Sequence, residues 1–131
     1  MIGLDTNILV RYLTFDDAVQ SPRAAQLIER HLTREDPGFV SLVTITEIAW
    51  VLRSTYEFTA VQIADAIDRM LQIESLVVQN QREVLLATDA FRSGIASFDD
   101  ALIAALGRWA GCSHSVTFDR KAARLPDFRL A

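Results

Sequence analysis

Four acidic residues stand where side chains from distant parts of the chain can converge. They are Asp5, Glu47, Asp100 and Asp119, and each lies at the end of an apolar run typical of a strand or at the start of a helical pattern. In open α/β sheets, ligands bind in the crevice at the carboxyl ends of the strands. Carboxylate oxygens are the ligands that Mg²⁺ and Mn²⁺ prefer, and no Cys/His zinc pattern is present. The four acids therefore predict a divalent-metal site.

Each acid also has a purely structural explanation. Asp5 can cap the helix that it precedes, and Thr44 with Glu47 three residues later is typical of a capping box. Asp100 lies in a first helical turn, where a carboxylate meets the positive end of the helix dipole. Asp119 can begin a solvated turn. These explanations are individually sufficient, but they do not explain four acids in equivalent positions of one sheet.

Strands and helices alternate along the chain. The apolar runs predict strands at residues 2–4, 39–42, 76–78 and 113–117. Periodic segments predict helices over residues 7–13, from 21, from 44, over 59–73, from 80 to 94 and from 97 to 111. The expected helix starts are Ser21 followed by Pro22, Thr44 with Glu47, Thr59 with Gln62, Asn80 with Glu83, and Ser97. Right-handed crossovers then give a three-layer α/β/α sandwich with a central, mostly parallel sheet.

Composition narrows the class of protein. The chain has 131 residues, half of them hydrophobic, which suits one domain with its own core. The chain begins directly with the first strand, and no apolar run approaches the roughly 20 residues that span a bilayer. We therefore expect a cytoplasmic protein with no membrane partner. The single cysteine, Cys112, cannot form an internal disulfide and is expected to be a small buried residue.

Charge leaves nucleic-acid binding open. The net charge of −4 and the pI of about 5.1 lack the basic footprint that phosphate binding normally leaves. A metal that neutralised the four acids would cancel that charge. All but one of the 13 basic residues are arginines, which match phosphate geometry, although this bias can also reflect genome composition.

Four segments carry the acids. They are residues 4–10 (LDTNILV), 46–52 (TEIAWVL), 97–104 (SFDDALIA) and 117–122 (TFDRKA). Together they resemble the motifs of the PIN-domain ribonucleases, and especially of the VapC toxins of bacterial VapBC toxin–antitoxin pairs. The resemblance spans essentially the whole chain and implies a single PIN domain over residues 1–131. It also implies that the four acids bind the metal, with Thr6, Asn7 and Thr117 orienting ligands or water.

One motif departs from the family. Many relatives have Asp-Phe-Ala-Asp where this chain has Ser97-Phe98-Asp99-Asp100. Adjacent helical residues point about 100° apart, so both acids cannot face one crevice equally well. The resemblance makes Asp100 the ligand and leaves Asp99 exposed to solvent.

The resemblance also implies an activity and partners. The activity is endonucleolytic hydrolysis of RNA, of the transfer or ribosomal class, assisted by Mg²⁺ or Mn²⁺ and leaving 5′-phosphate ends. Arg11, Arg120, Lys121 and Arg53 are candidates for phosphate contact, with a solvated surface position as the alternative. The implied partners are a small antitoxin, whose tail occupies the crevice, and a second copy of the chain. Trp50, Leu52, Ile63, Ile67 and Met70 offer apolar surface for a dimer, although core packing explains them almost as well.

Other functions fit the sequence less well. A related Mg²⁺-dependent phosphatase or DNA nuclease and a catalytically silent PIN-like binding module remain as alternatives. A receiver domain would need a lysine in another context than Lys121. A general acid–base ribonuclease is disfavoured, because His31 and His114 are the only histidines and neither lies in a motif.

Overall fold

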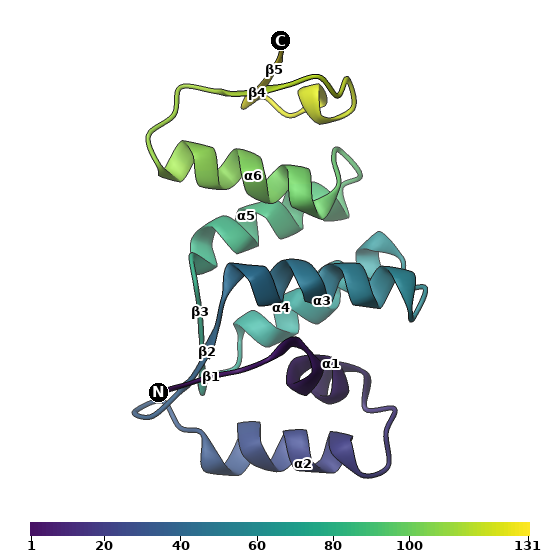
Figure 1. Ribbon diagram of the computed structural model, residues 1–131, viewed down its shortest axis with the longest axis vertical. Coiled ribbons are helices and arrows are strands. Elements are labelled where there is room, and N and C mark those ends of the chain that lie inside the picture. Colours follow the sequence, from purple (N-terminus) through teal and green to yellow (C-terminus); the bar gives the residue numbers. More distant parts are fainter. The chain divides into compact units, whose positions relative to one another are not determined.

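Six α-helices and five short strands alternate in the computed structural model, which describes residues 1–131 (Figure 1). The chain divides into two units, Met1–Gln79 and Asn80–Ala131. The first contains β1 (Ile2–Gly3), α1 (Thr6–Thr14), α2 (Gln20–Gln26), the π-helical turn η1 (Leu27–His31), β2 (Gly38–Val40), α3 (Leu42–Ser54), α4 (Ala60–Leu71) and β3 (Leu76–Val78). The second contains α5 (Gln81–Arg92), α6 (Phe98–Trp109), β4 (Ser115–Thr117), the 3₁₀ turn η2 (Ala122–Arg124) and β5 (Phe128–Leu130).

All strand pairs are parallel. In the first unit the strand order is β1-β2-β3, and Gly38 lies in register with Ile2 on one side and Leu76 on the other. In the second unit β4 pairs with β5, so that Ser115 lies opposite Phe128. Parallel pairing through helical crossovers confirms the predicted α/β pattern. The strand β5 was not predicted, because its sequence Phe128-Arg129-Leu130 is not a continuous apolar run like that of β3 and is too short to show an alternating pattern.

The core of the first unit explains most of the apolar residues on α3 and α4. Leu52, Ile63, Ile67 and Met70 are fully buried, whereas the Trp50 side chain is 67% exposed. The helix α3 packs against both α1 and α4. Core packing therefore accounts for four of the five residues that had suggested a dimer surface, and only Trp50 remains available.

Two helices start at other residues than predicted. The start of α3 is capped by Ser41, whose hydroxyl accepts a hydrogen bond from the Thr44 backbone N–H at 3.2 Å, so the predicted capping box of Thr44 and Glu47 is wrong. The helix α2 begins at Gln20 because the Asp17 carboxylate accepts that residue's N–H at 2.7 Å. Ser21 is therefore not the N-cap and is buried inside the first turn.

The other caps follow the sequence more closely. Thr59 and Gln62 form the predicted capping box, and the Ser97 hydroxyl caps α6. Asn80 precedes α5 as predicted, but its side chain donates to the Glu83 carboxylate at 3.0 Å instead of capping the backbone.

Both predicted helix-ending glycines adopt a left-handed conformation. The φ angle is +82° at Gly94 and +95° at Gly111, a region that residues with a Cβ rarely enter. Cys112 directly follows the second of these turns and is exposed, so its predicted burial is wrong. Among the helices, none combines the length and apolar character needed to cross a membrane.

Candidate active site

Asp5 links the first strand to the first helix. Leu4 extends the pairing of β1 by donating its N–H to the Phe39 carbonyl at 2.9 Å, and Asp5 follows in an extended conformation. Oδ1 of Asp5 then caps α1 by accepting the Thr6 N–H at 2.8 Å. The structural explanation for Asp5 is therefore confirmed, but it uses only one carboxylate oxygen. Oδ2 stays free for a ligand.

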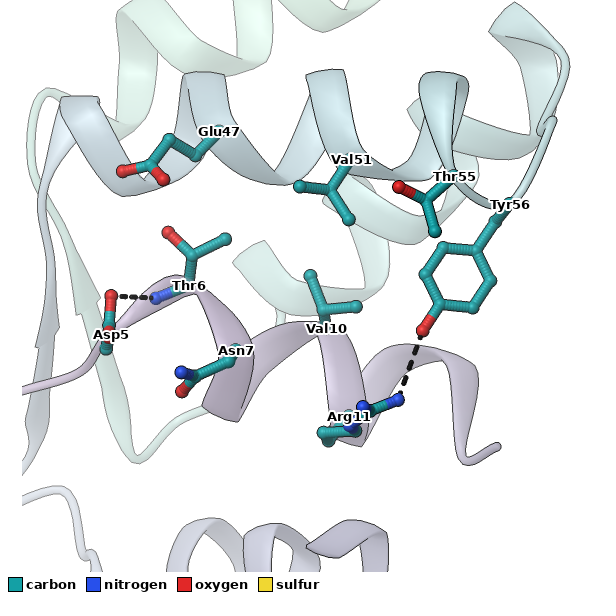
Figure 2. Close-up of a pocket in the computed structure, with 9 residues that line it drawn as sticks. All are labelled: Asp5, Thr6, Asn7, Val10, Arg11, Glu47, Val51, Thr55 and Tyr56. Carbon is teal, nitrogen blue, oxygen red and sulfur yellow. Dashed lines mark hydrogen bonds between the residues drawn. The ribbon is translucent and has the colours of Figure 1, made fainter. Parts of the chain in front are cut away.

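Glu47 lies on the second turn of α3 and takes no part in capping, because Ser41 performs that role. Its carboxylate is exposed and has no hydrogen bond or ion pair. Figure 2 shows Glu47 on α3 opposite Asp5 and Thr6 at the start of α1. The fold gives this carboxylate no structural partner, which leaves both of its oxygens for a ligand.

Asp5 and Glu47 line one pocket of about 390 Å³ in the first unit. The lining residues are Asp5, Thr6, Asn7, Val10, Arg11, Glu47, Val51, Thr55 and Tyr56. The Thr6 hydroxyl is buried and has no hydrogen-bond partner, although an unsatisfied buried hydroxyl costs free energy. Carboxylate, amide and hydroxyl oxygens at one end of the pocket are the donor set that suits Mg²⁺ or Mn²⁺. The residues present therefore fit such an ion.

Arg11 and Tyr56 form the other end of the same pocket (Figure 2). Arg11 Nη1 donates to Asp16 Oδ1 at 3.1 Å and to the Tyr56 hydroxyl at 3.3 Å, and Nε donates to Gln20 at 2.9 Å. The bond to Asp16 raises the pKa of Arg11. Hydrogen bonds from the hydroxyls of Thr14 and Tyr56, with a smaller contribution from Arg11, lower the pKa of Asp16 from 3.8 to about 2.

Asp100 is the third residue of α6 in the second unit. Its backbone N–H donates to the Ser97 hydroxyl at 3.1 Å, and its carboxylate has no hydrogen bond or ion pair. Asp100 is half-buried, whereas its neighbour Asp99 is exposed. The expected exposure of Asp99 is thus confirmed. The helix cap uses the backbone N–H of Asp100 and leaves its carboxylate without a partner.

Asp119 follows β4 and shapes the turn after it. Its carboxylate accepts the Lys121 backbone N–H at 2.8 Å, and its own N–H donates to the Thr117 hydroxyl at 3.0 Å. Thr117 therefore holds the backbone of Asp119 and makes no hydrogen bond to its carboxylate. Arg120 and Lys121 are exposed in the same turn. The turn explanation for Asp119 is confirmed, and its second carboxylate oxygen remains free.

The predicted site residues divide between the two units. Asp5, Thr6, Asn7, Arg11 and Glu47 share the pocket of the first unit. The second unit carries the others, namely Asp100 on α6 and Thr117, Asp119, Arg120 and Lys121 at the end of β4. Within either unit, no three Asp, Glu, His or Cys side chains gather closely enough to hold a metal ion. A site made of all four acids stays a prediction.

Two residues that organise the Arg11 end of the pocket were missed from the sequence. Tyr56 lines the pocket from the loop after α3, and Asp16 fixes Tyr56 and Arg11 from the loop after α1. Neither lies in one of the four motif segments. The hydrogen bond between Tyr56 and Asp16 joins residues 40 positions apart, a separation that no local pattern shows.

In open α/β sheets, ligands bind at the carboxyl ends of the strands, and Mg²⁺ in proteins is usually held by one or two carboxylates. Residues 2–127 match the PIN domain, so the chain belongs to the PIN-domain family. The match confirms the three-layer α/β/α fold class with a mostly parallel sheet. PIN domains are generally Mg²⁺-dependent nucleases. Comparison with curated proteins found no match.

Proposed function

We propose that this PIN-domain protein is an Mg²⁺- or Mn²⁺-dependent endoribonuclease and the VapC toxin of a toxin–antitoxin pair. The observation that carries the nuclease proposal is the pocket in which Asp5, Glu47 and the unpartnered Thr6 hydroxyl meet. The resemblance of the four motif segments to VapC toxins supports the toxin role. A cytoplasmic location accompanies this proposal, because transfer and ribosomal RNAs are found there.

In the proposed mechanism, Asp5 and Glu47 would hold the ion, and the motif resemblance adds Asp100 and Asp119 as further ligands. An ion held there would supply positive charge to stabilise the scissile phosphate and to favour ionisation of the attacking water. The capping bond from Thr6 N–H fixes the Asp5 carboxylate, so its free oxygen needs little reorganisation to bind. Asn7 offers an amide that can donate to a phosphate oxygen and accept from water. Hydrolysis then leaves a 5′-phosphate and a 3′-hydroxyl.

RNA binding in this proposal uses basic residues beside the acids. Arg11 lines the acid-containing pocket, and Arg120 and Lys121 are exposed next to Asp119. Such residues position the phosphate backbone without reading the bases. The substrate would be a transfer RNA or a structured ribosomal loop.

The nuclease proposal is tested with purified protein and a mixture of transfer and ribosomal RNA. We expect cleavage with Mg²⁺ or Mn²⁺, none with EDTA, and recovery when metal is added back in excess. The new ends should accept a ligase adaptor that requires a 5′-phosphate. Cleavage in EDTA that leaves cyclic phosphates would overturn the proposal. Cleavage of DNA alone would favour the DNA nuclease, and RNA binding without cleavage would favour the silent module.

The toxin proposal needs a separate test in cells. Expression of the chain should arrest growth, and the Glu47→Gln variant should not. Coexpression of a small neighbouring reading frame should restore growth and yield a complex of that product with a dimer of this chain. In that complex we expect an arginine of the antitoxin against the acids, because a cation can replace the charge of the metal. RNA cleavage without growth arrest would reject the toxin role and keep the nuclease.

A further inference from the structure

The end of the pocket remote from Asp5 holds an arginine whose side chain is largely fixed. A guanidinium has five N–H donors. In Arg11 three of them are used, by Gln20, Asp16 and Tyr56. Nη2 makes no hydrogen bond, so both of its N–H groups remain for a ligand.

Asp16 organises this end of the pocket. Oδ1 accepts hydrogen bonds from the Thr14 hydroxyl at 2.8 Å and from Arg11 at 3.1 Å, and Oδ2 accepts from the Tyr56 hydroxyl at 2.8 Å. The Tyr56 ring packs edge-to-face against Phe58 with centroids 6.1 Å apart. The network joins the end of α1 to the loop after α3, the helix that carries Glu47. Arg11 is therefore fixed relative to both acids of the pocket.

Between the two ends, the pocket presents an apolar surface. Val10 and Val51 face each other there, with Asp5 and Glu47 beyond them on one side and Arg11 and Tyr56 on the other (Figure 2). Arg11 is six residues from Asp5 along α1, which corresponds to roughly 9 Å of helix axis. A nucleic-acid strand carries a phosphate at every nucleotide, so a strand with one phosphate at the acid end brings a neighbouring phosphate towards Arg11.

We propose that Arg11 forms a second phosphate subsite for the RNA strand, and that Asp16 and Tyr56 are positioning residues that hold its guanidinium. The proposal rests on the proposed nuclease function and specifies how the strand lies in the pocket. A fixed guanidinium loses little conformational freedom when it binds phosphate, and hydrogen bonds between charged groups are stronger than neutral ones.

An electrostatic role and a positioning role of Asp16 predict opposite changes in RNA affinity when its carboxylate is removed. Its carboxylate cancels the charge of Arg11, so a purely electrostatic role predicts that Asp16→Ala tightens RNA binding. A positioning role predicts weaker binding, because the Arg11 side chain then samples several rotamers. The pKa of Asp16, which hydrogen bonds from Thr14 and Tyr56 lower to about 2, lies far below neutral pH, so its carboxylate is charged in either case. The two roles are thus distinguished by the sign of one measured change.

The test measures the affinity for a fluorescein-labelled, mixed-sequence single-stranded RNA by anisotropy, with Ca²⁺ in place of Mg²⁺. Arg11→Ala should weaken binding about tenfold, the effect of losing charged hydrogen bonds. Asp16→Ala should weaken it about fivefold, and Tyr56→Phe about threefold because one neutral hydroxyl is lost. Asp16→Ala added to Arg11→Ala should have no further effect, because a positioning residue acts only through its partner.

Two matched controls isolate the subsite. Tyr12→Phe also removes one tyrosine hydroxyl, which donates to Glu29 at 2.9 Å outside this pocket. Arg34→Ala also removes a paired arginine, which contacts Glu74 on the surface. Both variants should bind the RNA as the wild type does. If Asp16→Ala does not fold, Tyr56→Phe keeps the ring against Phe58 and carries the test.

The outcomes separate this subsite from the proposed function. In steady-state cleavage with Mg²⁺, the three variants should raise KM and change kcat little. Tighter binding by Asp16→Ala, or equal binding by the wild type and Arg11→Ala, overturns the subsite, as does a wild type that binds no RNA. Binding that depends on Arg11 without cleavage in Mg²⁺ or Mn²⁺ overturns the nuclease and keeps the subsite.

Discussion

Two pockets of the first unit share α1 and contain the same kinds of residues, yet they differ in which groups are left without a partner. The first, of about 390 Å³, combines Asp5, Glu47, Arg11 and Tyr56. The second, of about 300 Å³, is lined by Tyr12, Leu13, Phe15, Glu29, Arg69 and Ile73. Each thus offers a tyrosine, an arginine and at least one carboxylate. Composition alone does not distinguish them.

Hydrogen bonding distinguishes them. In the first pocket the Glu47 carboxylate is free and Arg11 is bonded to three side chains. In the second, the Tyr12 hydroxyl donates to Glu29 at 2.9 Å, and Arg69 has no hydrogen bond or ion pair. A free carboxylate beside Asp5 suits a cation, whereas a free arginine near the acid opposes one. Only the first pocket therefore fits a divalent metal.

The largest effect should come from exchanging a carboxylate for an amide in each pocket. Glu47→Gln should lower the rate of RNA cleavage more than about 100-fold, because even outer groups of metal sites contribute 10- to 100-fold. Glu29→Gln should stay within about twofold, since its role is a hydrogen bond to Tyr12. Initial cleavage rates with Mg²⁺ check both. Equal losses in the two variants would remove the distinction between the pockets.

A second pair of variants tests whether RNA cleavage needs an acid in addition to Asp5 and Glu47. Asp100→Asn should lower cleavage about 100-fold if Asp100 contributes a ligand, and it should cost the helix start only about 1 kcal/mol. Asp99→Asn should retain most activity, because Asp99 is exposed and its side chain points about 100° away from that of Asp100 around the helix axis. Cleavage rates and metal titrations measure both effects. An inactive Asp99→Asn with an active Asp100→Asn would shift the assigned ligand by one residue.

Much of the first pocket could be predicted from sequence, because its acids lie at the boundaries of elements. Asp5 follows an apolar strand, and the motif around Glu47 lies on a helix whose N-cap was predicted three residues late, at Thr44 instead of Ser41. Ser41 took the cap that had been assigned to Thr44, since an extended residue directly before the helix can accept the Thr44 N–H. Because Glu47 had been assigned to a capping box, the sequence did not show that its carboxylate has no hydrogen bond or ion pair.

The rest of the pocket depends on tertiary contacts. Tyr56 and Asp16 form a hydrogen bond between two loops, and nothing in their local sequence indicates that they hold Arg11 at the pocket. The exposure of Cys112 follows from the turn at Gly111, whereas the adjacent apolar strand had suggested burial. Such features depend on contacts between segments that are distant in sequence, which the periodicity of the sequence does not show.

A third prediction concerns the helix that carries Glu47 into the pocket. Ile48 is fully buried and Trp50 is 67% exposed, although both are large apolar residues of α3. Ile48→Ala should lower the free energy of unfolding by about 2–5 kcal/mol, because it leaves a cavity. Trp50→Ala should change it by no more than about 0.5 kcal/mol. Urea unfolding of both variants measures this, and a large loss for Trp50→Ala would show that this side chain is buried in the native protein.

The smallest expected effects are changes in the free energy of unfolding at low pH, from Asp16, and at high pH, from Tyr12. The pKa of Asp16, beside the first pocket, falls from 3.8 to about 2, mainly through the Thr14 and Tyr56 hydroxyls. A lowered carboxyl pKa contributes stability that is complete above about pH 4 and is lost as the pH falls towards 2. Tyr12, in the second pocket, has a pKa raised above 10.0, first by burial and then by its bond to Glu29. Its contribution is complete below pH 10 and is lost as the pH rises through the folded-state pKa.

Unfolding free energies of the wild type, Asp16→Ala and Tyr12→Phe, measured against pH, should separate these two contributions. The difference between the wild type and Asp16→Ala should be constant near neutral pH and should shrink between about pH 4 and pH 2. The difference between the wild type and Tyr12→Phe should instead shrink only above pH 10, because the phenol is neutral below it. If both differences stayed constant over the whole range, the hydrogen bonds to Asp16 and from Tyr12 would not persist in solution. The contrast between the two pockets would then lose its electrostatic basis.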